Sequence, residues 1–363
     1  MYMFNKKGDL LKNLLVIFGG CSSEYEISLK SAASVLRNID TEKYNVITVG
    51  ITKDGSWYHY TGDIDSIEND FWFTDEDTTP AILSPDRKDK SLIILNDLGA
   101  YEKVKIDVIF PVLHGKNGED GTIQGIFELA GISYVGCTPL ASSVCMDKAI
   151  TNTLADAAGI NGAKWVAFTE TQYREGKVNF AAVEAKLGYP IFVKPANAGS
   201  SVGISKAKNS AELINALEIA FQNDYKAVLE ECVIGREIEC AVMGNDHPVA
   251  SGVGEILPTA DFYDYEAKYI DNSTGLAIPA DLSPELTEKV RYEAVKAYSA
   301  MGCTGLSRVD FFLKDDGSVY LNEINTLPGF TSISMFPKLF AQAGVEYSRL
   351  IDMLIEYAEE RMK

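Results

Sequence analysis

An alternation of strand-like and helix-like segments between residues 14 and 138 constrains the fold more than any other feature of the sequence. Strands that alternate with helices predict an α/β domain with a parallel, doubly wound sheet, in which ligands bind at the carboxyl ends of the strands. Two glycine-rich turns, at 19–24 and 114–121, follow predicted strands and should lie at those ends. Residues 61–100 are charged and irregular, so we expect a surface insertion there. The alternating segments are, in order, "LLVIF" (14–18), "GGCSSEYEISLKSAASVLRNI" (19–39), "YNVITVGIT" (44–52), "IDVIFPVLHG" (106–115), "DGTIQGIFELAGI" (120–132) and "YVG" (134–136).

The pattern changes after residue 138. A helix is predicted at 146–160, and the segment "YPIFVKPANAGSSVGIS" (189–205) is typical of two strands joined by a loop. A mixed sheet is expected between 234 and 330, interrupted by a polar stretch at 259–275, and helices such as 337–361 close the chain. We therefore expect three domains: an α/β domain with a parallel sheet (1–138), a small α+β unit (139–233) and a larger α+β unit (234–363).

The composition limits the class of partner. A net charge of −19 on 363 residues argues against nucleic acid or an anionic membrane as a partner. No run of about 20 apolar residues predicts a membrane span, and the run Leu14–Phe18 is too short for a secretory leader. Six cysteines without a CxxC pair favour reduced thiols in a cytoplasmic protein, and three unclustered histidines argue against zinc.

A predicted hairpin carries four polar side chains among apolar ones. It consists of "LSRVDFFL" (306–313), "KDDGS" (314–318) and "YLNEINTLPG" (320–329). If Asp316-Gly317 is a two-residue turn, Asp310 lies opposite Glu323 and Arg308 lies opposite Asn325. All four side chains then share one face of the hairpin.

The chemistry of this face indicates a cation. Two carboxylates at cross-strand distance repel each other unless a cation lies between them, and oxygen ligands from Asp, Glu and Asn suit Mg²⁺ bound to phosphate. The hairpin therefore predicts the floor of a metal–nucleotide site. The alternative is an edge hairpin whose charged face meets water.

Further motifs are compatible with a nucleotide and a small substrate. Lys194 precedes the loop Gly199–Gly203, whose small residues would let backbone N–H groups approach phosphate, although a flexible hairpin is the alternative. "LEECVIGRE" (229–237) suits adenine and ribose edges, but solvent-facing glutamates fit it as well. His114 could line a ligand or be structural, and Glu24 could hold an ammonium group or interact with a helix dipole.

Together and in this order, these motifs resemble those of the D-alanine–D-alanine ligase family within the ATP-grasp superfamily, from about residue 14 to the C-terminus. The N-terminal motifs also resemble the vancomycin-resistance ligases that make D-alanyl-D-serine. The resemblance implies an N-terminal α/β domain followed by a two-part ATP-grasp fold. It implies ATP-dependent synthesis of D-alanyl-D-alanine for peptidoglycan precursors by a cytoplasmic homodimer, with two Mg²⁺ or Mn²⁺ ions. The matching patterns are "GG.S.E.E.S", "HG..GEDG", "KP...GSS.G", "FYDY.AKY", "R.DFF" and "NEINTLPGFTS.S".

The resemblance also implies a role for each matching residue. ATP phosphates would be bound by Lys148, Lys194, Ser200, Ser201, Val202 and Gly203, and adenosine by Glu230, Glu231, Cys232, Val233 and Glu237. The metal ligands would be Asp310, Glu323 and Asn325. Glu24 would hold the ammonium of the first D-alanine, and His114 would line the substrate site. Lys268, Ser334 and Met335 would contact the second D-alanine, and Arg308 with the Gly329 N–H the oxyanion. A link between Tyr269, Ser200 and Glu24 would hold the 259–275 loop down as a lid.

Met335 bears on the identity of the second substrate. Relatives that use D-serine commonly carry Arg at the position of Met335 in "TSISMFP" (331–337), and an apolar Met leaves a serine hydroxyl without a partner. D-alanine is therefore expected ahead of D-serine and D-lactate.

Two other functions compete with this one. A nucleotide-binding module that has lost catalysis would usually lack metal ligands or the oxyanion arginine, all of which are present here. A different ATP-grasp ligase would not explain "HGKNGEDG" (114–121) and "FYDYEAKY" (262–269).

Overall fold

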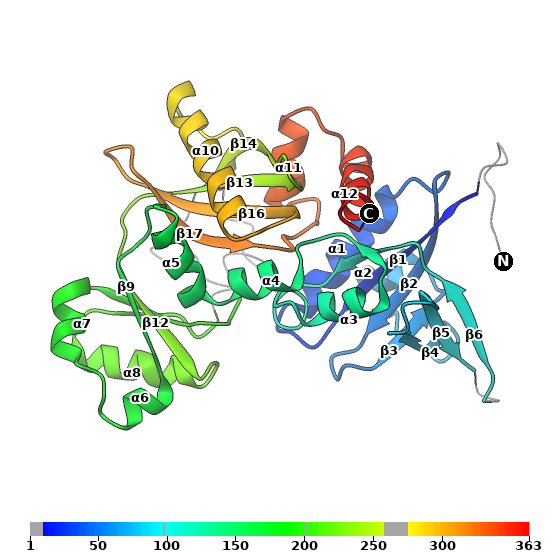
Figure 1. Ribbon diagram of the computed structural model, residues 1–363, viewed down its shortest axis with the longest axis horizontal. Coiled ribbons are helices and arrows are strands. Elements are labelled where there is room, and N and C mark those ends of the chain that lie inside the picture. Colours follow the sequence, from blue (N-terminus) through cyan, green and yellow to red (C-terminus); the bar gives the residue numbers. More distant parts are fainter. Residues whose placement is uncertain (1–9, 97–98, 200–201, 258–274, 363) are drawn as a thin grey trace.

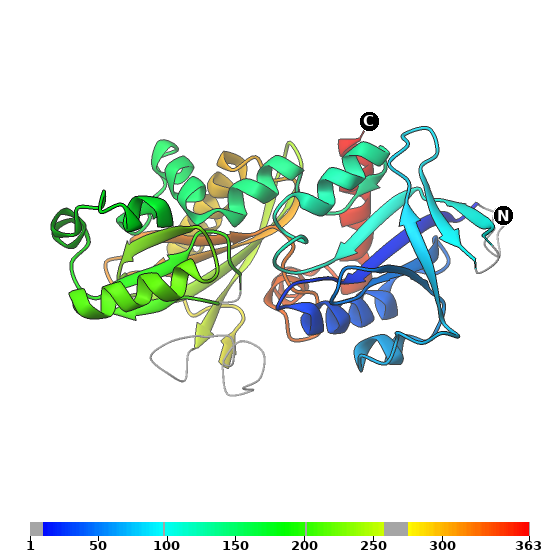
Figure 2. The same ribbon diagram turned by 90° about the horizontal axis from the view of Figure 1, so that it is seen from below.

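The computed structural model describes residues 10–96, 99–199, 202–257 and 275–362, which form three sheets with their helices (Figure 1). Five sequence-based expectations fall outside these residues: those for Ser200, Ser201, Lys268 and Tyr269, and for nearly all of the predicted lid. Figure 2 shows the N-terminal sheet and the small four-stranded sheet at opposite ends of the molecule. In the segments described, no helix is long and apolar enough to cross a membrane.

The N-terminal sheet confirms the predicted parallel arrangement around its first strand. In the described residues it has eight strands in the order β6-β5-β4-β3-β2-β1-β7-β8, and β2, β1, β7 and β8 are parallel. Leu14–Phe18 of β1 is fully buried, as expected for a continuous apolar run in a parallel sheet. The elements are β1 (Lys12–Gly19), α1 (Tyr25–Asn38), β2 (Tyr44–Ile51), β3 (Trp57–Tyr60), α2 (Ile64–Glu68), β4 (Thr78–Leu83), β5 (Ser91–Leu95), β6 (Tyr101–Lys105), β7 (Val108–Val112), α3 (Thr122–Ala130) and β8 (Ser133–Tyr134).

The expectation of an irregular surface insertion at 61–100 is wrong. Strands β4 and β5 extend the sheet by antiparallel pairing, and Leu83 and Leu92 are buried in its core. Trp72 is fully buried, with its ring 5.1 Å from that of Phe18. Short strands separated by charged turns hide their alternation in the sequence, and this explains the error.

The central part of the chain, where a small α+β unit is expected, forms a small antiparallel sheet with helices. Its four strands, counted in the described residues, have the order β11-β10-β12-β9, and α8 packs against β10, β11 and β12. Helices α4 and α5 precede it and connect it to the N-terminal sheet. The elements are α4 (Pro139–Met146), α5 (Lys148–Ala157), β9 (Trp165–Thr169), α6 (Glu170–Arg174), α7 (Phe180–Leu187), β10 (Ile191–Pro195), β11 (Ser205–Ala207), α8 (Ser210–Phe221) and β12 (Lys226–Glu231).

The third sheet is antiparallel and carries the predicted hairpin at its edge. Its five described strands have the order β15-β14-β13-β16-β17, with α10 packed on one face and α11 on the other. The predicted closing helix is two helices, because the chain turns at Gly344, whose φ is +88°. The elements are β13 (Arg236–Gly244), β14 (Val249–Leu257), β15 (Gly275–Ala277), α10 (Pro284–Ala300), β16 (Gly305–Leu313), β17 (Val319–Asn325), α11 (Met335–Gln342) and α12 (Tyr347–Arg361).

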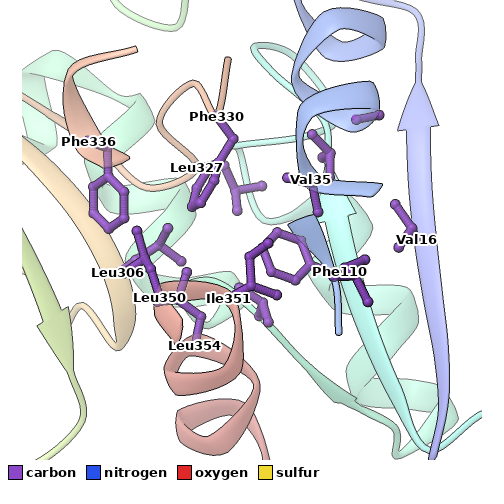
Figure 3. Packing of buried hydrophobic residues seen from close by; sticks show 14 of the residues in the cluster. Val16, Val35, Phe110, Leu306, Leu327, Phe330, Phe336, Leu350, Ile351 and Leu354 are labelled. Atoms are coloured by element: carbon purple, nitrogen blue, oxygen red, sulfur yellow. The ribbon is translucent and has the colours of Figure 1, made fainter. Parts of the chain in front are cut away.

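One apolar core joins the first and third sheets. Leu350, Ile351 and Leu354 of α12 are fully buried between Leu306 of β16 and Phe110 of β7 (Figure 3). The two sheets are therefore held together by side chains rather than by the connecting chain alone. We propose that the three sheets mark the domains expected at 1–138, 139–233 and 234–363, with α12 packed back on the first.

Candidate active site

The hairpin of β16 and β17 has the predicted pairing, although the turn is different. Arg308 lies opposite Asn325, and Asp310 lies opposite Glu323. The loop contains three residues instead of two, because the Lys314 N–H donates to the Ser318 carbonyl (3.0 Å) and Gly317 has a φ of +76°. A β-bulge between the pairs of Asp310 and Phe311 offsets this extra residue and restores the predicted pairs.

Arg308 is surrounded by carboxylates on this face. Its Nε and Nη2 donate to the two oxygens of Asp310 (2.8 and 2.7 Å), and its Nε lies 3.0 Å from Oε2 of Glu239. Asn325 Nδ2 donates to the same Asp310 carboxylate (2.9 Å). Burial disfavours the charged guanidinium, but the charges of Asp310 and Glu239 outweigh it and raise the pKa of Arg308 well above its usual range. Arg308 is therefore a fixed positive charge.

Sequence reasoning missed Glu239. It lies on β13, directly opposite Asp310, and is buried. Its signal in the sequence was its spacing of two from Glu237, since alternate residues of a strand share a face. Only the pairing of β13 with β16 places it beside Arg308, and residues as far apart in the sequence as Glu239 and Asp310 could not be paired by inspection.

Two adjoining clefts share Glu323. The first brings together residues from distant segments: Glu119 from the turn after β7, Lys148 from α5, Gly199 from the loop after β10, and Glu323 with Asn325 from β17. The second is lined by Glu237, Ile238, Glu239, Asp310, Phe311, Asn322 and Glu323. The predicted phosphate-binding Lys148 and two predicted metal ligands, Glu323 and Asn325, thus line the first cleft, and the third ligand, Asp310, lines the second.

The oxygen donors on this face fit a magnesium–nucleotide complex. Among the described residues, no group of three or more His, Cys, Asp or Glu side chains forms a complete metal site. Mg²⁺ is usually held by one or two carboxylates and takes most of its remaining ligands from phosphate and water. Asp310 and Glu323, directly opposite each other with Asn325 nearby, supply such a partial set.

The predicted nucleotide-binding residues lie around the loop between β10 and β11. Lys148 opens α5 after Asp147, which caps the helix, and its Nζ donates to the carbonyl of Ala198 in this loop (2.7 Å). Gly203, at the other end of the loop, has a φ of +74°. Val202 donates its N–H to the Gly199 carbonyl (3.1 Å).

Lys194 and Glu230 form a buried ion pair on neighbouring strands. Their Nζ and Oε2 are 2.6 Å apart, and Asn152 Nδ2 donates to the other oxygen of Glu230 (3.1 Å). Burial raises the pKa of Glu230, but the Lys194 ammonium outweighs it, so the pKa is lowered and the carboxylate stays charged. Glu231, Cys232 and Val233 follow at the end of β12, and Glu237 opens β13 at the second cleft.

Glu24 lies between two glycine turns. It is buried at the start of α1. A Cβ added to Gly115 would lie 2.3 Å from its Oε2, and one added to Gly199 would lie 3.0 Å from it. Both glycines therefore leave room for this carboxylate, which brings the N-terminal domain's predicted ammonium-binding group to the phosphate loop.

His114 and Glu119 form a second buried pair beside Glu24. His114 Nε2 is 3.0 Å from Ser31 Oγ, and its Nδ1 is 3.0 Å from the Leu327 carbonyl and 3.7 Å from Glu119. Burial raises the pKa of Glu119 to about 7, and the negative charges of Glu24 and Glu323 add to this. Glu119 was also missed, although it stands in the same "HGKNGEDG" motif as His114.

Two of the predicted acceptor residues, Ser334 and Met335, lie at the start of α11. Ser334 caps this helix, and its Oγ accepts the Thr331 N–H (3.0 Å) and would lie 2.8 Å from a Cβ at Gly329. Met335 is 4% exposed and packs against Gly254 in the core. Its side chain therefore lies within the apolar layer of the third sheet, and it is not among the residues that line the two clefts.

Comparisons with known proteins account for almost the whole chain. The family profile "D-ala D-ala ligase N-terminus" matches residues 13–137, and "D-ala D-ala ligase C-terminus" matches residues 154–356. The chain belongs to the D-alanine–D-alanine ligase family. A D-alanine–D-alanine ligase of Acetivibrio thermocellus is 52% identical over 96% of each chain.

Solved structures of the family share the fold. The VanG D-Ala:D-Ser ligase from Enterococcus faecalis is 43% identical, with a TM-score of 0.88 over 96% of this chain and 99% of that one. The D-alanine–D-alanine ligase of Bacillus anthracis, solved in complex with ATP, is 32% identical, with a TM-score of 0.72 over 97% of this chain and 98% of that one. Members of the family with either acceptor therefore resemble this chain.

Proposed function

We propose that the protein uses ATP to join two D-alanines, releasing ADP and phosphate, for the synthesis of peptidoglycan precursors. The observation that carries this proposal is the cleft in which Lys148, Gly199, Glu323 and Asn325 meet in a chain of this family. Nucleotide phosphates and a small amino acid bound between Glu24 and Arg308 would fit the charges around it. The reaction needs ATP as well as the amino acid, because a free carboxylate is a poor electrophile and has to be activated first.

The first step activates the carboxylate of the first D-alanine. Glu24 holds the ammonium group of the first D-alanine, and His114 lies behind Glu24. The carboxylate of this D-alanine attacks the γ-phosphate of ATP to give an acyl phosphate and ADP. Lys148, Lys194 and the loop Ser200–Gly203 hold the phosphates, and Glu230–Val233 with Glu237 hold adenosine. Two Mg²⁺ or Mn²⁺ ions, held by Asp310, Glu323 and Asn325, would neutralise charge on the transferring group.

The second step forms the peptide bond. The amine of the second D-alanine attacks the acyl carbon, and phosphate leaves from the resulting tetrahedral intermediate. Arg308 and the Gly329 N–H stabilise its oxyanion, since donors fixed before the reaction need no reorganisation. Lys268 and Ser334 hold the carboxylate of the second D-alanine, and Tyr269, linked to Ser200 and Glu24, closes the lid so that water does not hydrolyse the acyl phosphate.

Two statements about the protein in the cell belong to the same proposal. A dimer of two identical chains is expected from the family resemblance. The cytoplasm is the expected location, because ATP and the precursor pathway's substrates are available there.

The test of this proposal combines product analysis with Glu323→Gln. The wild type should form D-alanyl-D-alanine with one ADP per dipeptide, and ATP hydrolysis should depend on D-alanine. Glu323→Gln should lower turnover at least ~100-fold, about 2.7 kcal/mol of barrier, because the metal-binding face loses a charge. If the wild type hydrolyses ATP at the same rate with and without D-alanine, the protein would be a nucleotide-binding module without ligase activity. Near-normal turnover of Glu323→Gln at low Mg²⁺ would show that Glu323 is not a metal ligand.

A second candidate acceptor is D-serine, because the D-Ala:D-Ser ligase structure resembles this chain closely. The apolar, buried Met335 at the start of α11 still favours D-alanine. With D-alanine and D-serine at equal concentration, we expect mainly D-alanyl-D-alanine, with an unmatched hydroxyl costing roughly 10²-fold in kcat/KM. A wild type that prefers D-serine would reverse this choice.

A further inference from the structure

The Asp310 carboxylate has two partners to serve, the Arg308 guanidinium and the proposed metal ion. In the structure, both of its oxygens accept hydrogen bonds from Arg308, and one also accepts from Asn325. The proposed function, on which this inference rests, assigns the same carboxylate to a divalent metal. A cation that draws on Asp310 would leave the buried Arg308 guanidinium without its main counter-charge and would repel it.

Glu239 is placed to answer this conflict. Its Oε2 lies 3.0 Å from Arg308 Nε, and it approaches from β13, on the side of Asp310 away from Glu323. Its side chain is 10% exposed, so water screens its charge little. Glu239, Asp310, Glu323 and Arg308 carry three negative charges and one positive charge, a net charge of −2 that attracts divalent cations.

We propose that Glu239 is a positioning residue that keeps Arg308 in place when Asp310 turns to the metal. Arg308 then remains paired through Glu239 and points at the acyl carbon, while Asp310 binds the ion. Glu239 acts through Arg308 and does not ligate the metal. The loss of such a supporting group typically lowers metal affinity 10- to 100-fold.

The test measures binding rather than turnover. The affinity of a non-hydrolysable ATP analogue is determined by calorimetry over a series of Mg²⁺ concentrations for wild type, Glu239→Gln and Glu239→Asp. Glu239→Gln keeps the shape and loses the charge, and it should require roughly 10- to 100-fold more Mg²⁺ for the same nucleotide affinity. Glu239→Asp, which keeps the charge, should recover part of the loss.

Glu255→Gln is a matched control. Glu255 is a buried carboxylate on the same sheet, paired with Arg236 (2.6 Å), but it lies opposite Ile238, so its side chain is on the other face of the sheet from that of Glu239. The Mg²⁺ concentration that Glu255→Gln requires for nucleotide binding should equal that of the wild type. An equal loss in Glu255→Gln would show a general effect of sheet charge and would overturn the proposal.

The Arg308→Gln variant distinguishes a positioning role of Glu239 from direct binding of the metal by Glu239. In Arg308→Gln no guanidinium needs a partner, so adding Glu239→Gln should not change the Mg²⁺ requirement further. A further 10-fold loss in this background would make Glu239 a metal ligand and overturn the proposal, as would an unchanged Glu239→Gln single variant. If nucleotide affinity in the wild type is independent of Mg²⁺, the metal site of the proposed function fails, and this inference fails with it.

Discussion

Glu119 is a carboxylate that the structure surrounds with other ionisable side chains. It lies 3.7 Å from His114 and lines the same cleft as Glu323. Burial raises its pKa to about 7, far above that of an exposed carboxyl. The pKa of His114 is raised as well, because its interactions with Glu119 outweigh the lowering effect of burial. The folded protein therefore holds protons here that the unfolded chain would release.

The stability of the ligand-free protein should depend on pH through this pair. Both pKa values are higher in the folded state, so the contribution of each is present at low pH. That of Glu119 is lost as the pH rises from about 4.5 through about 7, and that of His114 as the pH rises through its raised pKa. We expect the free energy of unfolding to fall by on the order of 2–3 kcal/mol between pH 5 and pH 8 from this source. Urea unfolding at several pH values measures it, and Glu119→Gln should flatten the dependence. An unchanged slope in Glu119→Gln would assign the effect to other groups.

At the scale of elements, helix α11 determines what Met335 can do. Met335 opens the helix, and a Cβ at Gly254 of β14 would lie 2.7 Å from its sulfur. The side chain therefore fills a space that exists only because residue 254 is a glycine. An arginine cannot occupy this space without burying its charge.

Met335→Arg should consequently lower stability before it alters specificity. We expect a loss of about 2–4 kcal/mol in the free energy of unfolding, because a buried unpaired charge is costly even after the helix start shifts. Met335→Leu, which conserves volume, should cost less than about 1.5 kcal/mol. Denaturant unfolding measures both, and D-alanine/D-serine competition on the folded variant should show a shift towards D-serine. A stable arginine variant with an unchanged product ratio would exclude Met335 from both roles.

The hairpin shows how far sequence reasoning reaches. The alternation of polar and apolar residues predicted which face Arg308 and Asp310 share, since that pattern is local. The turn length was wrong by one residue, and the pairing of Asp310 with Glu323 held only because the bulge offsets it. Neither the bulge nor Glu239 could be predicted, because each depends on packing between strands that the local sequence does not encode.

The sequence also did not predict which residues from distant segments meet in the fold. The family resemblance supplied the roles of Lys148, Lys194 and Glu24, but not the Lys194–Glu230 ion pair. The roles expected for Ser200, Lys268 and Tyr269 lie outside the described residues. The packing of α12 on the first sheet also joins residues more than 300 positions apart, such as Val16 and Ile351.

For the whole molecule, the last turn of α12 connects three segments. The guanidinium of Arg361 donates to the Tyr134 carbonyl (2.9 Å), to the Thr304 hydroxyl (2.9 Å) and to the Gly136 carbonyl. It also lies 4.3 Å from the centre of the Tyr134 ring. Arg361 therefore ties the edge of the first sheet to the turn that leads into β16, the strand of Arg308.

Arg361→Ala should weaken the joint between the two sheets. Partly buried carbonyls would lose their donors, and we expect the free energy of unfolding to fall by about 2–4 kcal/mol. Arg361→Lys should recover less than half, because an ammonium lacks the planar fork that reaches several acceptors. Chemical unfolding followed by tryptophan fluorescence measures the change. A loss below about 0.5 kcal/mol in Arg361→Ala would show that α12 is held by its apolar face alone.

Because of the bulge, the effect of deleting one residue from β17 depends on its position along the strand. Asn322 is the residue without a partner in the ladder, so its deletion would leave Arg308 opposite Asn325 and Asp310 opposite Glu323. Deletion of Ile324, two positions further on, would move Asn325 to the opposite face. The strand can therefore lose the residue before Glu323 without losing the reactive face, whereas the loss of a residue between Glu323 and Asn325 displaces the amide from that face.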